Sequence, residues 1–472
     1  MVRALLYLLP FIALSLPLHT SCVDYQELGA FPVAFPAFST LVRAEGRPLP
    51  SDHVYDLFLS SFSVAPDATD HVWGVQDVGR TINEPGEIQP TLISDVFAWP
   101  NEVSIVPETV FAESGVVCVC SGRLPPKNNG SVALIAGWPG NVGDAVLISG
   151  TPQGQPWSYT RAPQWVDMNG DGRLDAVLAR LSFVLSPPPI PPTTQGELVW
   201  FEQPVSSGLQ TPNWASHVVI QGPEFGSLAV RLTITGGDEK QAFLCPEYFG
   251  RRFRIVWTED SGDIWTDPTL IRTATIDDDI ERYFDVQLTD VNGDGKDDLL
   301  VVTSSQLTSA MGRKPNGTVR VYEIPEDFRS GTWERHVIAS GFSVPGSMTM
   351  GKGTPGSAVL LKRDSNKPTI LLSGDDDRHA YLLVPSTDDP ADWSYDKRPL
   401  LASTGIVGGV SAADIDGDGN IEAFIPAYGE DKVHVFRFAD AANGSDVRMV
   451  NSGTVGLLSP VSVIVAWLVH YG

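Results

Sequence analysis

The sequence predicts an all-β protein built from repeated four-stranded units, and three observations lead to this prediction. An acidic loop motif occurs three times at nearly constant spacing. Each copy is followed by a short apolar run without helical periodicity, as expected of a buried β-strand. Glycine and proline are plentiful, with 44 and 37 residues among 472, and only 19% of residues are charged. This composition favours a fold with many turns.

The motif copies read "DMNGDGRLDAVL" from Asp167, "DVNGDGKDDLLV" from Asp290 and "DIDGDGNIEAFI" from Asp414, so their starts lie 123 and 124 residues apart. Constant spacing of a specific motif indicates a structural repeat. In an EF-hand, position 12 would be a bidentate Glu and helices would flank the loop. Position 12 is instead Leu178, Val301 or Ile425. The motif is therefore predicted to be a loop between two strands.

The chemistry of this loop points to calcium, a hard cation that takes about six to eight oxygen ligands. Oxygens at positions 1, 3 and 5 of a tight turn converge, position 7 offers a main-chain carbonyl, and position 9 adds a carboxylate. Glycine at position 6 tolerates the positive φ that the turn needs. We expect about three ions. The candidate ligands are Asp167, Asn169, Asp171, Arg173, Asp175, Asp290, Asn292, Asp294, Lys296, Asp298, Asp414, Asp416, Asp418, Asn420 and Glu422.

The spacing of the motifs is too long for one four-stranded unit and fits two units of roughly 60 residues each. Within the repeat, units are expected to begin near 163, 228, 283, 345 and 408. The unit at 345 is expected to place "MGKGTPGSAVLL" (350–361) where others have the calcium loop. Residues 50–160 leave room for two more units, with candidate inner strands at 53–62 and 115–122. The total is seven.

Closure of the ring is expected at the last unit, which reaches its third strand at "KVHVFRF" (432–438) and then lacks an obvious fourth. The N-terminal stretch "FPAFSTLVR" (35–43) is predicted to supply that strand. Pairing the first and last units in this way removes exposed sheet edges, which otherwise invite aggregation.

These motifs resemble the FG-GAP/VCBS repeat family, the β-propeller class found in integrin α-subunit heads. The resemblance covers residues 160–440 well and 50–160 weakly. It implies a seven-bladed β-propeller over residues 30–440, with calcium-stapled blades, an extracellular location and a binding role. It does not name a ligand, because a fold alone does not define a function.

The N-terminal residues 1–22 have the pattern of a secretory signal peptide, with Arg3 ahead of an apolar stretch. The net charge of −25 argues against a nucleic-acid partner, which needs a basic face. Glycosylation sequons at Asn129, Asn316 and Asn443 are compatible with secretion. We therefore expect a secreted or cell-surface glycoprotein.

The C-terminal residues 446–472 comprise a polar spacer and an apolar tail, and the small residues 443–445 precede them. This layout is that of a GPI-attachment signal. The tail is alternatively the missing outer strand of the last blade or a membrane span, for which its length is marginal. Apart from such an anchor, no membrane contact is expected.

Cysteine and histidine leave alternatives open. Cys118 and Cys120 share a strand face, and one of them can pair with Cys245 in an oxidising compartment; buried free thiols are the other interpretation. His217 and His336 each follow a tryptophan by three residues, which favours packing. His379 adjoins three aspartates, as a general base would, although this stretch and "DDDIER" (277–282) read more simply as solvated acidic turns.

The function predicted is a binding or recognition module for an extracellular glycan or protein. Long connections at 182–196 and 304–317 belong to the face opposite the calcium loops, and recognition often uses long loops on a rigid scaffold. No catalytic or cofactor-binding residue is assigned, since nucleophile-elbow, zinc-protease and phosphate-loop motifs are missing from the sequence. The alternative is a sugar lyase resembling the aldos-2-ulose dehydratase propeller; a lectin is a third interpretation.

Overall fold

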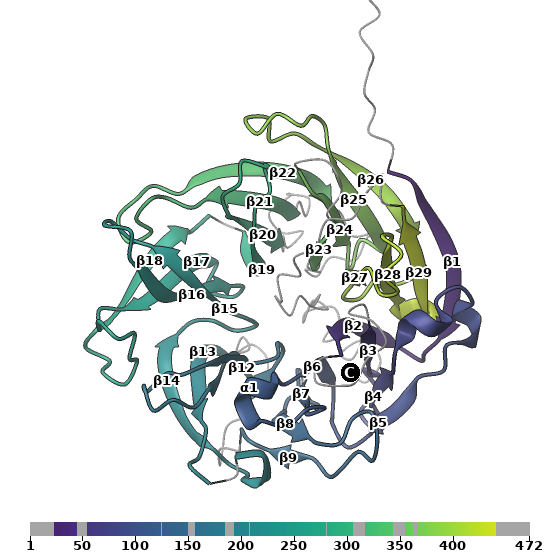
Figure 1. Ribbon diagram of the computed structural model, residues 1–472, viewed down its shortest axis with the longest axis horizontal. Helices are drawn as coiled ribbons and strands as arrows, with labels where there is room; N and C mark the ends of the chain where they lie inside the picture. The colour runs from purple at the N-terminus through teal and green to yellow at the C-terminus, as the bar shows by residue number, and fades with distance from the viewer. Residues whose placement is uncertain are drawn as a thin grey trace, which may run out of the picture.

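The computed structural model describes residues 23–44, 54–123, 125–149, 156–184, 193–206, 208–279, 281–304, 317–342, 355–361 and 367–439. Seven antiparallel sheets form a ring around a central axis (Figure 1). Strands account for 51% of the structure and helix for 5%. The protein is therefore an all-β, seven-bladed propeller, as the sequence predicted.

Each blade runs from an inner strand at the axis to an outer strand at the rim. The first blade consists of β2 (Pro36–Arg43), β3 (Tyr55–Ser61), β4 (His71–Val75) and β5 (Thr91–Ser94), and the second of β6 (Pro100–Ile105), β7 (Val117–Ser121), β8 (Val132–Ile135) and β9 (Val146–Leu147). The third consists of β10 (Ser158–Tyr159) with β11 (Gln164–Val166), then β12 (Asp175–Val184), β13 (Thr193–Glu202) and β14 (Ala215–Gln221). The fourth consists of β15 (Leu228–Thr233), β16 (Glu239–Glu247), β17 (Arg252–Thr258) and β18 (Ile271–Asp277). In the third blade, β10 and β11 share the inner position, since both pair with β12.

The remaining blades follow the same order. The fifth blade consists of β19 (Arg282–Thr289), β20 (Asp298–Ser304), β21 (Gly317–Glu323) and β22 (Glu334–Phe342). The sixth consists of β23 (Ala358–Leu361), β24 (Thr369–Ser373), β25 (His379–Pro385) and β26 (Tyr395–Ala402). The seventh consists of β27 (Ser411–Ala413), β28 (Ile421–Ala427), β29 (Lys432–Phe438) and β1 (Tyr25–Pro32). The short helical segments are α1 (Glu108–Phe111), η1 (Val78–Thr81), η2 (Pro85–Glu87), η3 (Gly208–Gln210) and η5 (Tyr428–Glu430).

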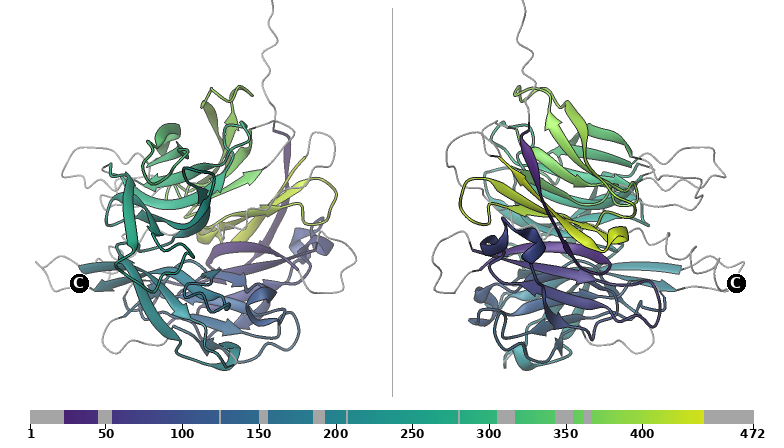
Figure 2. Two further views of the ribbon diagram at one scale, coloured as in Figure 1. Left: turned by 60° about the vertical axis from the view of Figure 1, so that its left-hand side comes forward. Right: turned by 90° about the vertical axis from the view of Figure 1, so that its right-hand side faces the viewer.

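The ring closes through the N-terminal strand, but not through the stretch that the sequence suggested. β1 pairs antiparallel with β29, from Tyr25 opposite Phe438 to Pro32 opposite Lys432, and the edge-on views show the two strands side by side (Figure 2). The predicted closing stretch, 35–43, instead forms β2, the inner strand of the first blade. The physical reason is burial: most residues of β2 are buried, whereas most residues of β1 are exposed or half-buried, as in an outer strand.

Two other strand predictions were wrong in position within the blade. Segments 53–62 and 115–122 hold β3 and β7, which are second strands and not inner ones. Both strands are entirely buried, so a continuous apolar run does not distinguish a second strand from its inner neighbour. The unit start expected at 345 lies outside the described residues. Within 350–361, the described part forms the inner strand β23, so it does not replace a calcium loop.

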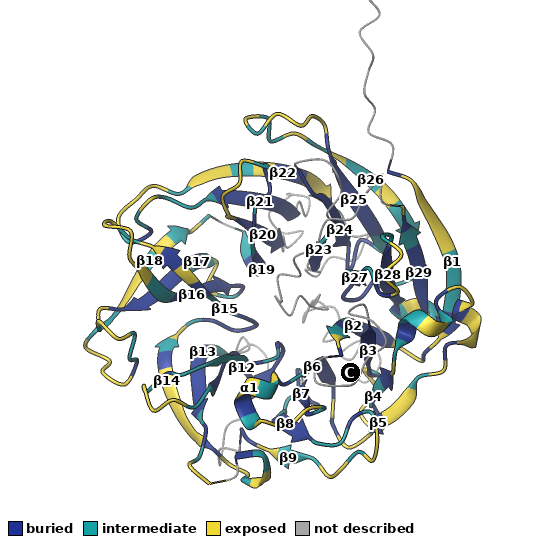
Figure 3. Cartoon of the chain, in the orientation of Figure 1, coloured by how far each residue is buried: buried dark blue, intermediate teal, exposed yellow. Residues whose placement is uncertain are grey.

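The other predicted unit starts are confirmed within a few residues, at Gln164, Leu228, Arg282 and Ser411. The core lies between neighbouring blades, because successive side chains on each strand point to opposite faces of its sheet. Trp200 of the third blade, for example, packs in one cluster with Phe243 of the fourth. Inner strands are mostly buried and outer strands partly exposed (Figure 3).

Several sequence predictions concern segments outside the described residues. These are the signal-peptide segment 1–22, the tail 446–472, and the greater part of the connections at 182–196 and 304–317. Within the described residues, no helix is long and apolar enough to span a membrane. Of the three sequons, only Asn129 is described, and it is exposed. The described cysteines, Cys118, Cys120 and Cys245, are buried free thiols.

Candidate calcium loops and a central cavity

The three acidic loops each connect an inner strand to the second strand of its blade, as predicted. They lie between β11 and β12, between β19 and β20, and between β27 and β28. Because strand direction alternates within a blade, these three connections emerge on the same face of the ring.

The same hydrogen-bond pattern closes all three loops. In the second loop, the Asp290 carboxylate accepts hydrogen bonds from the backbone N–H groups of Gly293 and Gly295 at 2.7 and 2.9 Å. Asn292 Oδ1 accepts from the N–H of Asp294 at 3.0 Å, and Asp294 Oδ1 accepts from that of Lys296 at 2.8 Å. The corresponding bonds recur in the first and third loops. The side chains of positions 1, 3 and 5 are thus all turned into their own loop.

Glycine at position 6 has a left-handed backbone in every loop, as predicted, with φ between +84° and +88° at Gly172, Gly295 and Gly419. A second glycine at position 4 has φ between +75° and +78° in the three loops. This second requirement was not predicted, although the repeated "GDG" in the sequence indicates it. Any other residue at either position would be strained.

The carboxylates at position 9 are buried beneath the loops. Asp298 Oδ2 accepts a hydrogen bond from the N–H of Val291, at position 2, at 3.1 Å, and Asp175 and Glu422 do the same in their loops. Burial raises the pKa of Asp175 to about 6, and that of Asp298 and of Glu422 to about 7. Each loop therefore concentrates negative charge in a poorly solvated place, which a bound cation would offset.

The donor set fits a calcium ion, since it offers carboxylate and amide oxygens of the kind that this ion prefers. In the third loop, ligand oxygens of Asp414, Asp416 and Glu422 lie within 4.8 Å of one another. The loops differ in neighbouring cations. Arg173 pairs with Asp171 in the first loop, and Arg437 contacts Asp416 and Glu422 in the third. Over the described residues, no basic side chain pairs with the carboxylates of the second loop.

A cavity of about 480 Å³ occupies the axis of the ring and is lined by residues from the inner strands of all seven blades. Its wall includes aliphatic side chains such as Leu41, Ile105 and Leu288, and the hydroxyl-bearing Ser39 and Ser104. Small-molecule sites typically have volumes of about 300–1,000 Å³. The cavity is therefore large enough for a small ligand.

Three charged side chains lie on the wall of this cavity, and none of them was predicted from the sequence to be a site residue. Glu102 comes from β6, Arg161 from the connection between β10 and β11, and Asp285 from β19. All three are buried. Arg161 Nη2 is 2.6 Å from Asp285 Oδ1, and Glu102 Oε2 accepts a hydrogen bond from the N–H of Ala162 at 2.8 Å. Each residue belongs to a different blade, so no local sequence motif predicts the cluster.

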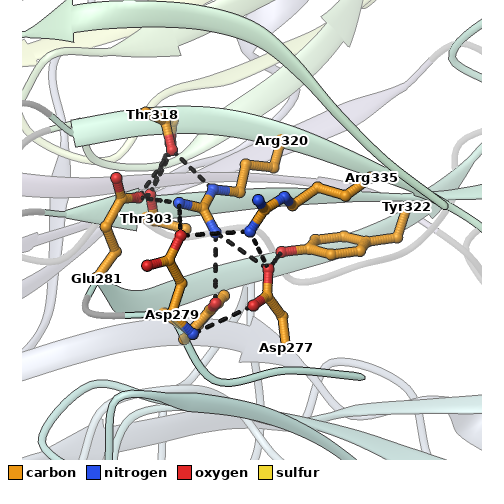
Figure 4. Close-up of polar contacts among 9 residues, drawn as sticks. Asp277, Asp279, Glu281, Thr303, Thr318, Arg320, Tyr322 and Arg335 are labelled. Atoms are coloured by element: carbon orange, nitrogen blue, oxygen red, sulfur yellow. Dashed lines mark hydrogen bonds and ion pairs between the residues drawn. The ribbon is translucent and has the colours of Figure 1, made fainter. Parts of the chain in front are cut away.

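A second charged cluster lies between the fourth and fifth blades and corrects one sequence prediction (Figure 4). Asp277, Asp279 and Glu281, expected to be a solvated acidic turn, surround the guanidinium of Arg320 at 3.1, 3.2 and 2.8 Å. Arg335 also pairs with Asp277, at 2.9 Å. The Arg320 side chain is only 4% exposed. The acids are needed because a buried guanidinium without partners is costly.

The histidines pack as predicted, with one correction nearby. His217 stacks on Trp200 with ring centroids 4.1 Å apart, and His336 stacks on Trp393 at the same separation. His336 also lies 2.7 Å from Glu323. His379 contacts Asp377 at 2.9 Å, but Asp375, Asp376 and Asp377 are all buried, so this stretch is not the solvated turn that we expected.

The fold and its repeated loops define a seven-bladed β-propeller with acidic inter-strand loops. Residues 284–322 match the FG-GAP repeat family, so the chain is a propeller that carries an FG-GAP repeat, as the motifs suggested. The match covers β19, the second loop and β20, and ends in β21. No curated protein sequence matches the chain.

Solved propellers of several activities show a distant likeness. An α-L-arabinanase from Penicillium chrysogenum, solved with arabinobiose, is 11% identical over 88% of this chain and 97% of its own, with a TM-score of 0.41. An α-L-arabinofuranosidase from Fusarium graminearum, solved with an iminosugar inhibitor, is 9% identical over 88% and 98%, with a TM-score of 0.39. The Dos1 propeller is 10% identical over 83% and 77%, with a TM-score of 0.37. We draw no functional conclusion from similarities this weak.

Proposed function

We propose that the protein is a calcium-stabilised recognition module that works outside the cell. The observation that supports this is the common geometry of the three loops, in which the same backbone bonds turn alternate oxygens into each loop. Calcium would be held by the side chains at positions 1, 3, 5 and 9 and by the carbonyl at position 7. It would supply positive charge that neutralises the clustered carboxylates and ties each inner strand to its neighbour.

Thermal unfolding with and without calcium tests the first half of this proposal. Extracellular calcium is millimolar, so sites with dissociation constants of about 10⁻⁴–10⁻³ M would be filled. An ion that binds only the folded state raises its stability. We expect a calcium chelator to lower the melting temperature, and added calcium, but not added potassium, to restore it. A melting curve that the chelator leaves unchanged would show that the stabilising role is wrong.

The recognition role is tested by screening the secreted protein against a glycan array and a library of extracellular proteins. Binding without turnover supports a recognition module. Binding that requires calcium would also show that the acidic loops contribute to the ligand-binding surface. Consumption of an aldosulose substrate would instead support the lyase alternative, and failure to bind any glycan or protein would argue against a recognition role.

The cellular location is part of the same proposal and rests on the terminal segments of the sequence. Cells that express the full chain are treated with phosphatidylinositol-specific phospholipase C, and the medium is assayed for the propeller. Release by the enzyme is expected if a GPI anchor is attached near 443–445. A chain that ends at Ala442 is the control and should reach the medium without the enzyme. A secreted full-length product that still contains Trp467 would rule out the anchor.

A further inference from the structure

The central cavity holds a charged cluster that the calcium loops do not involve. Arg161 reaches from the third blade to Asp285 in the fifth. It passes over Gly226, just before the fourth blade, where a Cβ atom would lie 3.1 Å from the Arg161 Cγ. Because Gly226 has no side chain, the Arg161 side chain has space to reach Asp285 at the cavity wall.

Two carboxylate oxygens in this cluster have no hydrogen-bond partner. They are Glu102 Oε1 and Asp285 Oδ2, and both atoms are buried. The other oxygen of each group is engaged, by the Ala162 N–H and by Arg161 respectively. Buried polar atoms in native proteins are nearly always paired, and an unpaired one is costly. Both residues line the same cavity, so a ligand bound there can supply the donors that these two acceptors lack.

The charges of the cluster indicate which kind of ligand fits. The arginine is paired with Asp285, and Glu102 adds a second carboxyl to the cluster. The cluster therefore presents no excess of positive charge and offers little attraction to an anion. The remaining wall combines aliphatic side chains, such as Leu41 and Leu228, with the hydroxyls of Ser39 and Ser104. A ligand with several hydroxyl donors and an apolar C–H face matches both parts of the wall.

We propose that the central cavity binds a neutral carbohydrate of one or two rings, whose hydroxyl groups donate hydrogen bonds to Glu102 Oε1 and Asp285 Oδ2. This inference deepens the proposed recognition function, on which it rests, by assigning the ligand class and its position. It places the ligand on the axis of the ring, in contact with several inner strands.

Saturation-transfer NMR and titration calorimetry with neutral monosaccharides and disaccharides test the proposal. The panel includes glucose, galactose, mannose, xylose and arabinose. The informative variant is Glu102→Gln, since glutamine keeps an oxygen for the Ala162 N–H and places an amide donor where the free acceptor stood. We expect the affinity for the best sugar to fall about tenfold or more. Glu224→Gln, a buried carboxyl outside the cavity, should bind like the wild type.

Hydrogen exchange on the wild-type protein gives a second readout that needs no variant. Bound sugar should slow exchange in the inner strands β6 and β19 and leave the outer strands β9 and β22 unchanged. The proposal is overturned if no neutral sugar binds, if Glu102→Gln binds as tightly as the wild type, or if protection appears only at outer strands. Sugar binding that Glu102→Gln leaves intact would overturn this site while the recognition function stands. A screen without any glycan or protein ligand would instead overturn the function itself.

Discussion

Tyr25 lies directly opposite Phe438 in the ladder that joins β1 to β29, so the first described strand completes the last blade. The ring is thereby closed by hydrogen bonds between segments that lie about 400 residues apart in the chain. Closure of this kind covers the outer edge of β29 and ties the last blade to the N-terminal segment that continues into the first blade.

The first prediction concerns this closing strand. Phe31 is 1% exposed and packs in the cluster between the last and first blades. Phe31→Ala is expected to lower the free energy of unfolding by about 3–5 kcal/mol, because it leaves a cavity in that core. Chemical denaturation measures the change. Tyr25→Ala is the control on the same strand, since Tyr25 is 47% exposed, and should cost much less. Equal effects of the two variants would contradict the assigned role of β1.

The second prediction concerns the second candidate calcium loop, the one whose carboxylates have no basic partner among the described residues. Asp294→Ala removes a proposed ligand and is expected to lower the melting temperature in calcium. It should also shrink the shift that a chelator causes. Asp297→Ala is the matched control, because Asp297 is an exposed acid of the same loop at a position that offers no ligand. A chelator shift that Asp294→Ala leaves at its wild-type size would remove this loop from the proposal.

The third prediction concerns the acidic cluster around Arg320. Arg320→Met leaves three neighbouring carboxylates without their buried partner, so the free energy of unfolding should fall by about 3–5 kcal/mol. Arg335 pairs with two of the same acids, but its side chain is 42% exposed. Arg335→Met should therefore cost about 1 kcal/mol or less. Comparable losses in urea denaturation would show that Arg320 is not the centre of the cluster.

The fourth prediction follows from the ionisation of Asp277 in that cluster. Burial opposes its charged form, but hydrogen bonds from Tyr322 and Arg335 and the charge of Arg320 outweigh burial, so its pKa lies below 3.8. A carboxyl with a lowered pKa stabilises the fold above its unfolded-state pKa and loses this contribution as the pH falls through its folded-state value. Asp277→Asn should thus be destabilising at pH 7, and its effect should diminish below pH 3.8. Unfolding measured across this range checks it.

The fifth prediction concerns Glu102, whose pKa burial raises from 4.5 to about 7. A carboxyl with a raised pKa contributes stability that is complete below 4.5 and is lost as the pH rises through about 7. Glu102→Gln removes this dependence. It should therefore be more stable than the wild type at pH 8, by roughly 3 kcal/mol, and similar to it near pH 4.5. A variant that is less stable at both values would show that the carboxylate is paired.

The sequence by itself determined the local features of this protein. Each acidic loop is a contiguous segment whose own side chains close it, so the residues from Asp290 to Asp298 identified both the turn and its position between two strands. The spacing of that segment, halved, predicted the length of one blade, and the remaining length of the chain then predicted seven blades. The closing strand was not identified from the sequence, because β1, β2 and β3 all mix apolar and polar residues and this pattern alone does not order strands within a blade.

The tertiary structure alone decided which distant charges meet. Glu102, Arg161 and Asp285 lie in different blades and carry no shared motif, yet closing the ring brings them to one cavity. In the same way, the sequence predicted a solvated turn for the acids from Asp277 to Glu281, whereas in the structure Arg320 lies among them. A buried charge requires partners wherever the chain supplies them, and those partners are set by the arrangement of the blades and not by neighbours in the sequence.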